Sequence, residues 1–101
     1  MDNLLKIGIS QDTINNMIET SGINNVEELD VNYDNTNKIL TALKQLKIRK
    51  ETIDILLINY IDLFLMNYNK FLLKIRNCDL KELSFDINND AGVVEEIFLN
   101  D

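Results

Sequence analysis

The chain has 101 residues, a net charge of −7 and one cysteine. This length suffices for one domain with its own hydrophobic core, so we expect a single domain over residues 1–101. The lone Cys78 cannot form an internal disulfide and no signal peptide opens the chain, which favours a cytoplasmic protein, while the longest apolar stretch, residues 55–66, is too short and too polar to span a membrane.

The charge is unevenly distributed along the chain. Residues 1–34 carry a net charge of −6, residues 35–78 carry +5, and residues 79–101 carry −6. A uniformly acidic surface would argue against contact with nucleic acid, whereas a basic middle segment between acidic ends leaves such contact open. The acidic ends either fold against the basic segment or leave it exposed, and this decides whether it is a binding face.

The first part of the chain predicts two helices joined by a tight turn. Residues 2–7 form a short helix that ends before Gly8, because glycine is the usual residue just after a helix C-terminus. Ser10 caps a second helix, which ends at Gly22 and has Ile14, Met17 and Ile18 on one face. This pattern is typical of a helix with one buried face.

The next segment predicts a loop and a third helix. Residues 24–29 add one or two helical turns, and the polar run of residues 30–37 is the best candidate for a loop. The third helix starts at Asp34 or Asn35 and carries apolar residues at helical spacing, namely Ile39, Leu40, Leu43 and Leu46. Its end near Lys47 is marked by neither Gly nor Pro.

Residues 51–67 are apolar at nearly every position. A helix that is apolar all round is either surrounded by its neighbours or shared with a second subunit. The sequence therefore predicts a homodimer as one assembly, with Leu56, Leu63 and Phe64 as candidate self-association residues. The helical period continues after residue 70, so we expect a break near Asn69.

The C-terminal segment fits helices better than strands. Leu80, Leu83 and Ile87 have helical spacing, although residues 83–87 also alternate as a strand would. Asp90 caps a last helix with an apolar face made of Val93, Val94, Ile97 and Phe98. We predict an all-α fold, a small bundle of stacked helical hairpins with about five to seven helices, and the alternative is a winged domain closed by a small C-terminal β-hairpin.

An internal repeat supports the stacked hairpins. At an offset of 39 residues, the first copy aligns with the second: Leu4, Ile7, Ile9, Asp12, Thr13, Ile14, Met17 and Ile18 match Leu43, Leu46, Ile48, Glu51, Thr52, Ile53, Leu56 and Leu57. Each copy predicts a helix, a tight turn with a buried Ile, and a capped helix. An equally good alignment of two unrelated amphipathic hairpins is the alternative explanation.

The turn of the second copy concentrates positive charge. Lys44, Lys47, Arg49 and Lys50 lie within seven residues, and cations at a helix start oppose the helix dipole. Contact with phosphate groups, with acidic groups of this or another protein, or plain exposure to solvent would account for them. No aromatic residue lies among them in the sequence, which disfavours stacking with single-stranded nucleic acid. Later cations extend the candidate binding surface to Lys70, Lys74 and Arg76.

Other motifs are incomplete. Gly8-Ile9-Ser10 has the spacing of a helix-turn-helix, but the helix that would read DNA has no Lys or Arg. Residues 86–92 resemble half a calcium loop whose Gly comes one place late and whose twelfth position is Ile97. The chain has no His, and no base is paired with Cys78, so we expect neither an enzyme nor a bound metal or cofactor. The candidate acidic surface comprises Glu27, Glu28, Asp30, Asp86, Asp90, Glu95 and Glu96.

The segment of residues 43–48, followed by Ile53, Leu56, Leu57 and residues 63–65, resembles the helical repeat of the mitochondrial transcription termination factor family. Those repeats pair two helices with a short third and stack into a curved solenoid. The resemblance implies a helical architecture and nucleic-acid binding along a basic groove.

We therefore expect a non-catalytic interaction module that binds a protein partner through its charged surface. Small acidic proteins of this kind include phage- or mobile-element-encoded inhibitors and regulators of nucleic-acid enzymes, in which acidic groups imitate a phosphate backbone. The alternative is a nucleic-acid-binding regulator that uses the basic middle segment.

Overall fold

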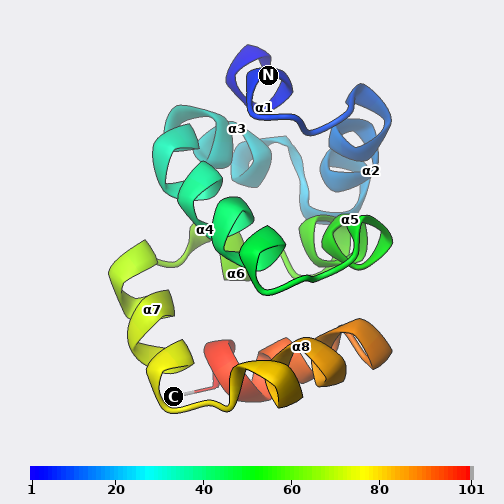
Figure 1. The fold of residues 1–101 in the computed structure, drawn as a ribbon. Helices are drawn as coiled ribbons and strands as arrows, with labels where there is room; N and C mark the ends of the chain where they lie inside the picture. Colours follow the sequence, from blue (N-terminus) through cyan, green and yellow to red (C-terminus); the bar gives the residue numbers. More distant parts are fainter. Residues whose placement is uncertain (101) are drawn as a thin grey trace.

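The fold, shown in Figure 1 as a computed structural model that describes residues 1–100, consists of helices and their connections, with no strand among those residues. The helices are α1 (Asp2–Lys6), α2 (Gln11–Ser21), α3 (Ile23–Val31), α4 (Tyr33–Gln45), α5 (Lys50–Asn59), α6 (Asp62–Leu65), α7 (Tyr68–Arg76), α8 (Leu80–Asn89) and the π-helix η1 (Glu95–Leu99). The all-α prediction is confirmed. The winged alternative is wrong, because the segment proposed for the hairpin forms α8 and η1.

Two boundaries explain why the helices outnumber the five to seven predicted. The polar run of residues 30–37 is not a loop: α3 ends at Val31, α4 begins at Tyr33, and only Asn32 separates them. Thr36, fully buried, joins the two helices because its hydroxyl lies 3.2 Å from the Leu29 carbonyl and 3.3 Å from the Asn32 carbonyl. A hydrogen bond between consecutive helices therefore stabilises a helical conformation in a segment whose polarity alone predicts a loop.

The apolar segment of residues 51–67 has one break more than predicted. The break expected near Asn69 lies at Met66 and Asn67, between α6 and α7. The additional break follows the end of α5 at Asn59, where the chain turns at Tyr60 before the short α6. Leu63 and Phe64 of α6, like Leu56 of α5, have no exposed surface, because the turn directs α6 into the same core. Leu56, Leu63 and Phe64, the candidate self-association residues, are therefore covered by their own chain and offer no exposed surface to a second subunit.

The internal repeat is present in the backbone. In the first copy, Ile9 N–H donates to the Leu4 carbonyl (3.0 Å) and Gly8 N–H donates to the Leu5 carbonyl (3.1 Å). In the second copy, the residues 39 positions later make the same bonds at 3.1 Å and 3.0 Å: Ile48 to Leu43 and Lys47 to Lys44. Both turns have the hydrogen bonds that commonly end a helix at a residue in the left-handed region, and φ is +98° at Gly8 and +66° at Lys47.

Equivalent side chains of the two copies are buried alike. The paired core residues, each at most 7% exposed, are Leu4 with Leu43, Ile9 with Ile48, Thr13 with Thr52, Ile14 with Ile53, and Met17 with Leu56. The second helices of the copies, α2 and α5, make the most extensive contact between helices. Each hairpin thus buries its apolar face on the other.

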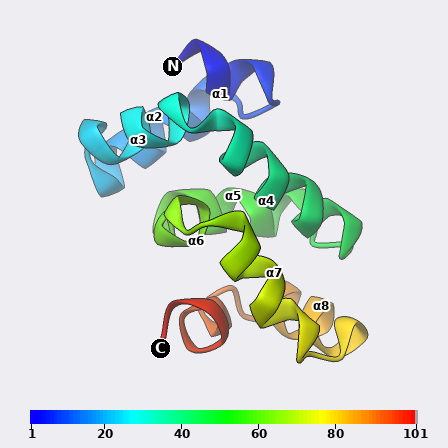
Figure 2. The same cartoon turned by 90° about the vertical axis from the view of Figure 1, so that its left-hand side faces the viewer.

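The C-terminal third closes the other end of the molecule. In Figures 1 and 2, α1 to α3 lie at one end, and α7, α8 and η1 lie at the other. Phe98 of η1 stacks on Phe71 of α7, with ring centroids 4.9 Å apart, and both rings are buried. One core cluster runs from Leu4 to Phe98, so the described residues share a single core.

Two asparagines fasten the chain where no helix provides backbone partners. Asn35 donates to the Met66 carbonyl (2.9 Å) and accepts from Tyr68 N–H (2.9 Å). Asn88 donates to the Lys47 carbonyl (3.1 Å) and accepts from Arg49 N–H (2.9 Å). Each side-chain amide pairs with a carbonyl and with the N–H two residues later, as a neighbouring β-strand would.

We expect Asn35→Ala to lower the free energy of unfolding by about 1–3 kcal/mol, because Met66 and Tyr68 lose a partner at a partly buried position. Urea unfolding followed by circular dichroism measures this. The control is Asn37→Ala, an exposed residue of the same helix, which should change stability by less than about 0.5 kcal/mol. Equal effects of the two substitutions would contradict the role given to Asn35.

Candidate interaction groove

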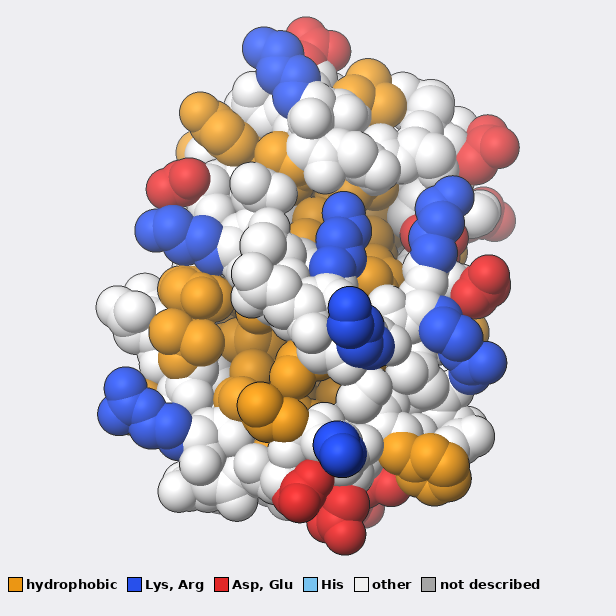
Figure 3. Space-filling model, viewed as in Figure 1, with side chains coloured by type: hydrophobic (Ala, Val, Ile, Leu, Met, Phe, Trp, Pro, Cys, Tyr) orange, Lys and Arg blue, Asp and Glu red, His pale blue; other side chains and the backbone are white. Residues whose placement is uncertain are grey.

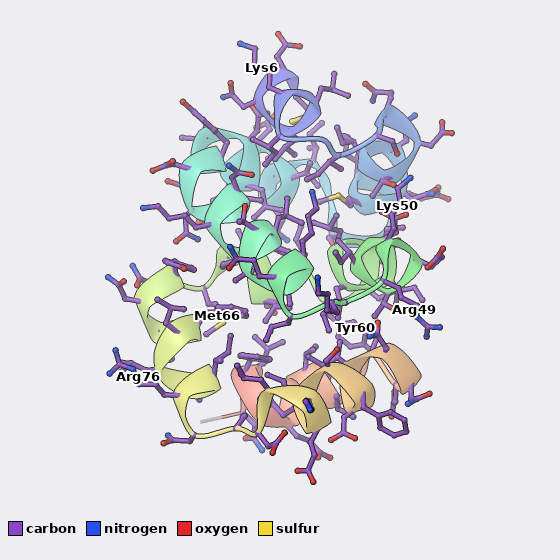
Figure 4. The ribbon with its side chains drawn as sticks, in the orientation of Figure 1. Lys6, Arg49, Lys50, Tyr60, Met66 and Arg76 are labelled. Atoms are coloured by element: carbon purple, nitrogen blue, oxygen red, sulfur yellow. The ribbon has the colours of Figure 1, made fainter. Side chains whose placement is uncertain are left out.

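The structure divides the predicted basic surface into two separate parts. Lys44, Lys47, Arg49 and Lys50, which we call the turn cations, surround the turn between α4 and α5. Lys70, Lys74 and Arg76 belong to α7. In Figure 4, Arg49 and Lys50 lie on the right at the start of α5, while Arg76 projects from α7 at the lower left. The seven cations therefore do not form one continuous surface.

The turn cations themselves face two sides. Lys47 and Arg49 line a groove between the turn and α8, whereas Lys44 and Lys50 line a smaller pocket next to the α1–α2 turn. Figure 4 shows this division at the start of α5, where Lys50 lies on the side of α2 and Arg49 on the side of α8.

The groove between the turn and α8 combines apolar and basic side chains. It has a volume of about 700 Å³, and its apolar side chains are Leu46, Leu80 and Phe85. Leu80 is 52% exposed and Phe85 is 68% exposed, although both are large hydrophobic residues. Its cations are Lys47, Arg49 and Lys81. Figure 3 shows basic side chains in blue across the middle of this face, with exposed hydrophobic side chains in orange beside them.

Within residues 1–100, the acidic ends form no ion pair with the turn cations. Among these residues, Lys38 and Asp34 of α4 form an ion pair at 3.7 Å. No acid of residues 1–100 lies within 4.0 Å of the charged group of a turn cation. The C-terminal segment reaches the turn through Asn88, whose carbonyl accepts from the Arg49 guanidinium at 2.8 Å. A neutral amide, not a carboxylate, holds α8 against the turn, so the positive charge stays available to a partner.

The first copy of the repeat shows that the fold does not require these cations. The residues equivalent to Lys44, Lys47, Arg49 and Lys50 are Leu5, Gly8, Ser10 and Gln11, and they build the same turn without positive charge. Lys47 even adopts a left-handed φ of +66°, where a residue with a Cβ is disfavoured by about 1–2 kcal/mol. A lysine at this position therefore costs stability.

The predicted acidic surface is also divided. Glu27, Glu28 and Asp30 lie on α3 at one end of the molecule, and Glu95 and Glu96 lie on η1 at the other. Asp30 is occupied within the fold, because its carboxylate accepts from Leu4 N–H at 3.1 Å.

Two further predicted acids, Asp86 and Asp90, belong to α8 and its C-terminus, and Asp90 accepts from Gly92 N–H (3.1 Å). Asp62, Glu95 and Glu96 line a hollow of about 380 Å³. The seven predicted acids form no single surface that could imitate a phosphate backbone.

Sequence reasoning missed most residues of the groove, among them Leu80, Lys81 and Phe85. Each is more than 30 positions from the turn, and Lys81 belongs to a segment with a net charge of −6. Since only the placement of α8 against the turn brings them together, no local pattern could have identified them. No aromatic residue lies near the turn cations in the sequence, but the fold places Phe85 in the same groove as Lys47 and Arg49.

The described residues contain no group of three or more His, Cys, Asp or Glu side chains that could hold a metal ion. Among the same residues, no helix has the length and apolarity needed to cross a membrane. Comparison with models of known protein families, with curated proteins and with solved structures finds no match. The groove therefore has to be interpreted from its own chemistry, and the family resemblance stays a prediction.

We expect Lys47→Gly to raise the free energy of unfolding by about 0.5–1 kcal/mol, because relief of the left-handed φ outweighs the larger chain entropy of unfolded glycine. Thermal unfolding tests this as a higher Tm. Lys44→Gly is the matched control: Lys44 is an equally exposed lysine in the last turn of α4, where glycine should cost about 1 kcal/mol. Destabilisation by both substitutions would contradict the strain assigned to Lys47.

Proposed function

We propose that the chain is a non-catalytic protein-binding module whose groove between the turn and α8 binds an acidic, amphipathic segment of a partner protein. The observation that carries the proposal is the exposure of Leu80 and Phe85 beside Lys47, Arg49 and Lys81. An apolar stripe on the partner would cover the two hydrophobic side chains, and acidic residues beside that stripe would meet the cations.

A helix is the form of partner that suits this groove. Residues of α8 line it over nearly the whole helix, from Leu80 to Asn89, so its length matches roughly three helical turns of a bound segment. Apolar residues spaced three or four apart on the partner would follow Leu80 and Phe85, as in other complexes in which a helix lies in a groove. The acids Glu82 and Asp86 of α8 do not line the groove.

A second candidate function is binding of single-stranded nucleic acid. It is favoured by Phe85, because an exposed aromatic ring beside cations can stack on a base while the cations contact phosphates. The net charge of −7 disfavours this function, since long-range repulsion slows the approach of a polyanion. We therefore place the protein partner first.

A second copy of the chain is a further occupant that the experiment must distinguish. The exposed face of α3 carries Ile23 and Val31, which are 49% and 75% exposed, and Glu27 lies between them at helical spacing. Such a contact would join two different surfaces and would continue from copy to copy instead of closing as a dimer. A monomer in sedimentation at high protein concentration would exclude it.

The proposal is tested with a designed helical peptide of about twelve residues, with leucines on one face and glutamates beside them. Fluorescence anisotropy should show binding that weakens with salt, and Lys47→Gly and Phe85→Ser should each weaken it about tenfold, since few residues carry most of the affinity of an interface. Lys6→Gln is the control, because it removes one charge from α1, at the far end of the molecule in Figure 4.

Two results would contradict the proposal. One is equal affinity for a peptide of the same apolar pattern with lysines in place of glutamates, because the cations would then have no part in recognition. The other is tight binding of single-stranded DNA that falls steeply with salt and is lost in Phe85→Ser, which would favour the second candidate function.

A further inference from the structure

A second cavity lies on the opposite side of the turn, between the two copies of the repeat. Its volume is about 250 Å³, and the turn after α1 and the helices α4 and α5 enclose it. The apolar walls are Ile7, Ile9, Leu40, Ile48, Ile53 and Leu57. In Figure 3, hydrophobic side chains show through the middle of this face between basic ones.

A glycine forms part of the wall of this pocket. Gly8 lines the pocket, and a Cβ placed on it would meet no atom within 4 Å. Five of the six apolar wall residues are buried, from 1% to 6% exposed, so the walls belong to the core and are already formed. A preformed pocket with apolar walls and a few polar groups is the usual form of a small-molecule site, and this one is smaller than a typical drug-sized pocket of about 300–1,000 Å³.

The charges on the pocket select the ligand. Lys44 and Lys50 line it, and neither makes an ion pair within 4.0 Å with an acid of the described residues. Asp54 also lines the pocket, so its three charged groups sum to +1. Two ammonium groups favour an anion, but one carboxylate disfavours a second negative charge on that anion. The first copy has Leu5 and Gln11 at the positions of the two lysines, so the turn folds without them.

We propose that this pocket binds a small monoanionic carboxylate with a compact apolar body, such as an aromatic or branched aliphatic acid. The apolar body lies against Ile9, Ile48 and Leu57, and the carboxylate lies between Lys44 and Lys50. The site uses neither Lys47 nor Phe85, so it is independent of the groove proposed for the protein partner.

The probe is benzoate, titrated into the ¹⁵N-labelled full chain and followed by amide chemical shifts. Saturable shifts should appear at millimolar benzoate around Ile7 to Ile9 and around Ile48 to Lys50, and not along α7. The paired substitution Lys44→Leu with Lys50→Gln, which installs the residues of the first copy, should weaken binding about tenfold. Lys47→Gly is the control and should leave the affinity unchanged, because Lys47 faces the groove.

Two related ligands and one substitution test the charge argument. Benzamide, which has the same shape without the charge, and phenyl phosphate, which is largely dianionic at neutral pH, should both bind more weakly than benzoate. Asp54→Asn should raise the affinity for phenyl phosphate more than the affinity for benzoate. Equal binding of benzamide, tighter binding of phenyl phosphate by the unaltered chain, or no saturable shift with benzoate would each overturn the proposal. Circular dichroism of each variant establishes that it is folded.

Discussion

The packing of α2 against α5 is the contact on which the rest of the structure depends. Each is the second helix of one repeat copy, and neither hairpin is large enough to bury its apolar face alone. The equivalent positions Met17 and Leu56, one on each of these helices, have no exposed surface. This contact fixes the positions of both turns, and every feature proposed to bind a ligand or partner lies beside one of them.

Duplication of the hairpin separates the requirements of folding from those of binding. Both turns use the same two backbone hydrogen bonds and the same buried Ile, at Ile9 and Ile48, so these residues specify the turn. The first turn is neutral, and the second carries four cations, one of them in a conformation that favours glycine. A charged feature that the fold can omit, and that costs stability at Lys47, supports the proposal that these cations contact a partner.

Two asparagine side chains place the C-terminal third. Asn35 holds the start of α7, and Asn88 holds α8 against the second turn, so the groove exists because an amide bridges Lys47 and Arg49. Apolar contacts are not directional and allow one segment to shift along another. A side-chain amide that binds both a carbonyl and an N–H fixes the position of that segment, because hydrogen bonds are directional. The groove cations thus keep a defined position relative to Leu80 and Phe85, which a specific partner would require.

The sequence by itself determined the all-α class, the capped helix after Ser10 and the repeat at 39 residues, because local spacing, caps and turn residues encode these features. Only the tertiary structure decided that residues 30–37 are mostly helical, that Leu63 and Phe64 belong to the core, and that α8 completes a groove with the turn. The first depends on the hydrogen bond between Thr36 and Leu29 of the preceding helix. The other two depend on contacts between residues distant along the chain, such as the hydrogen bonds of Asn88, and neither helical periodicity nor local charge carries information about such contacts.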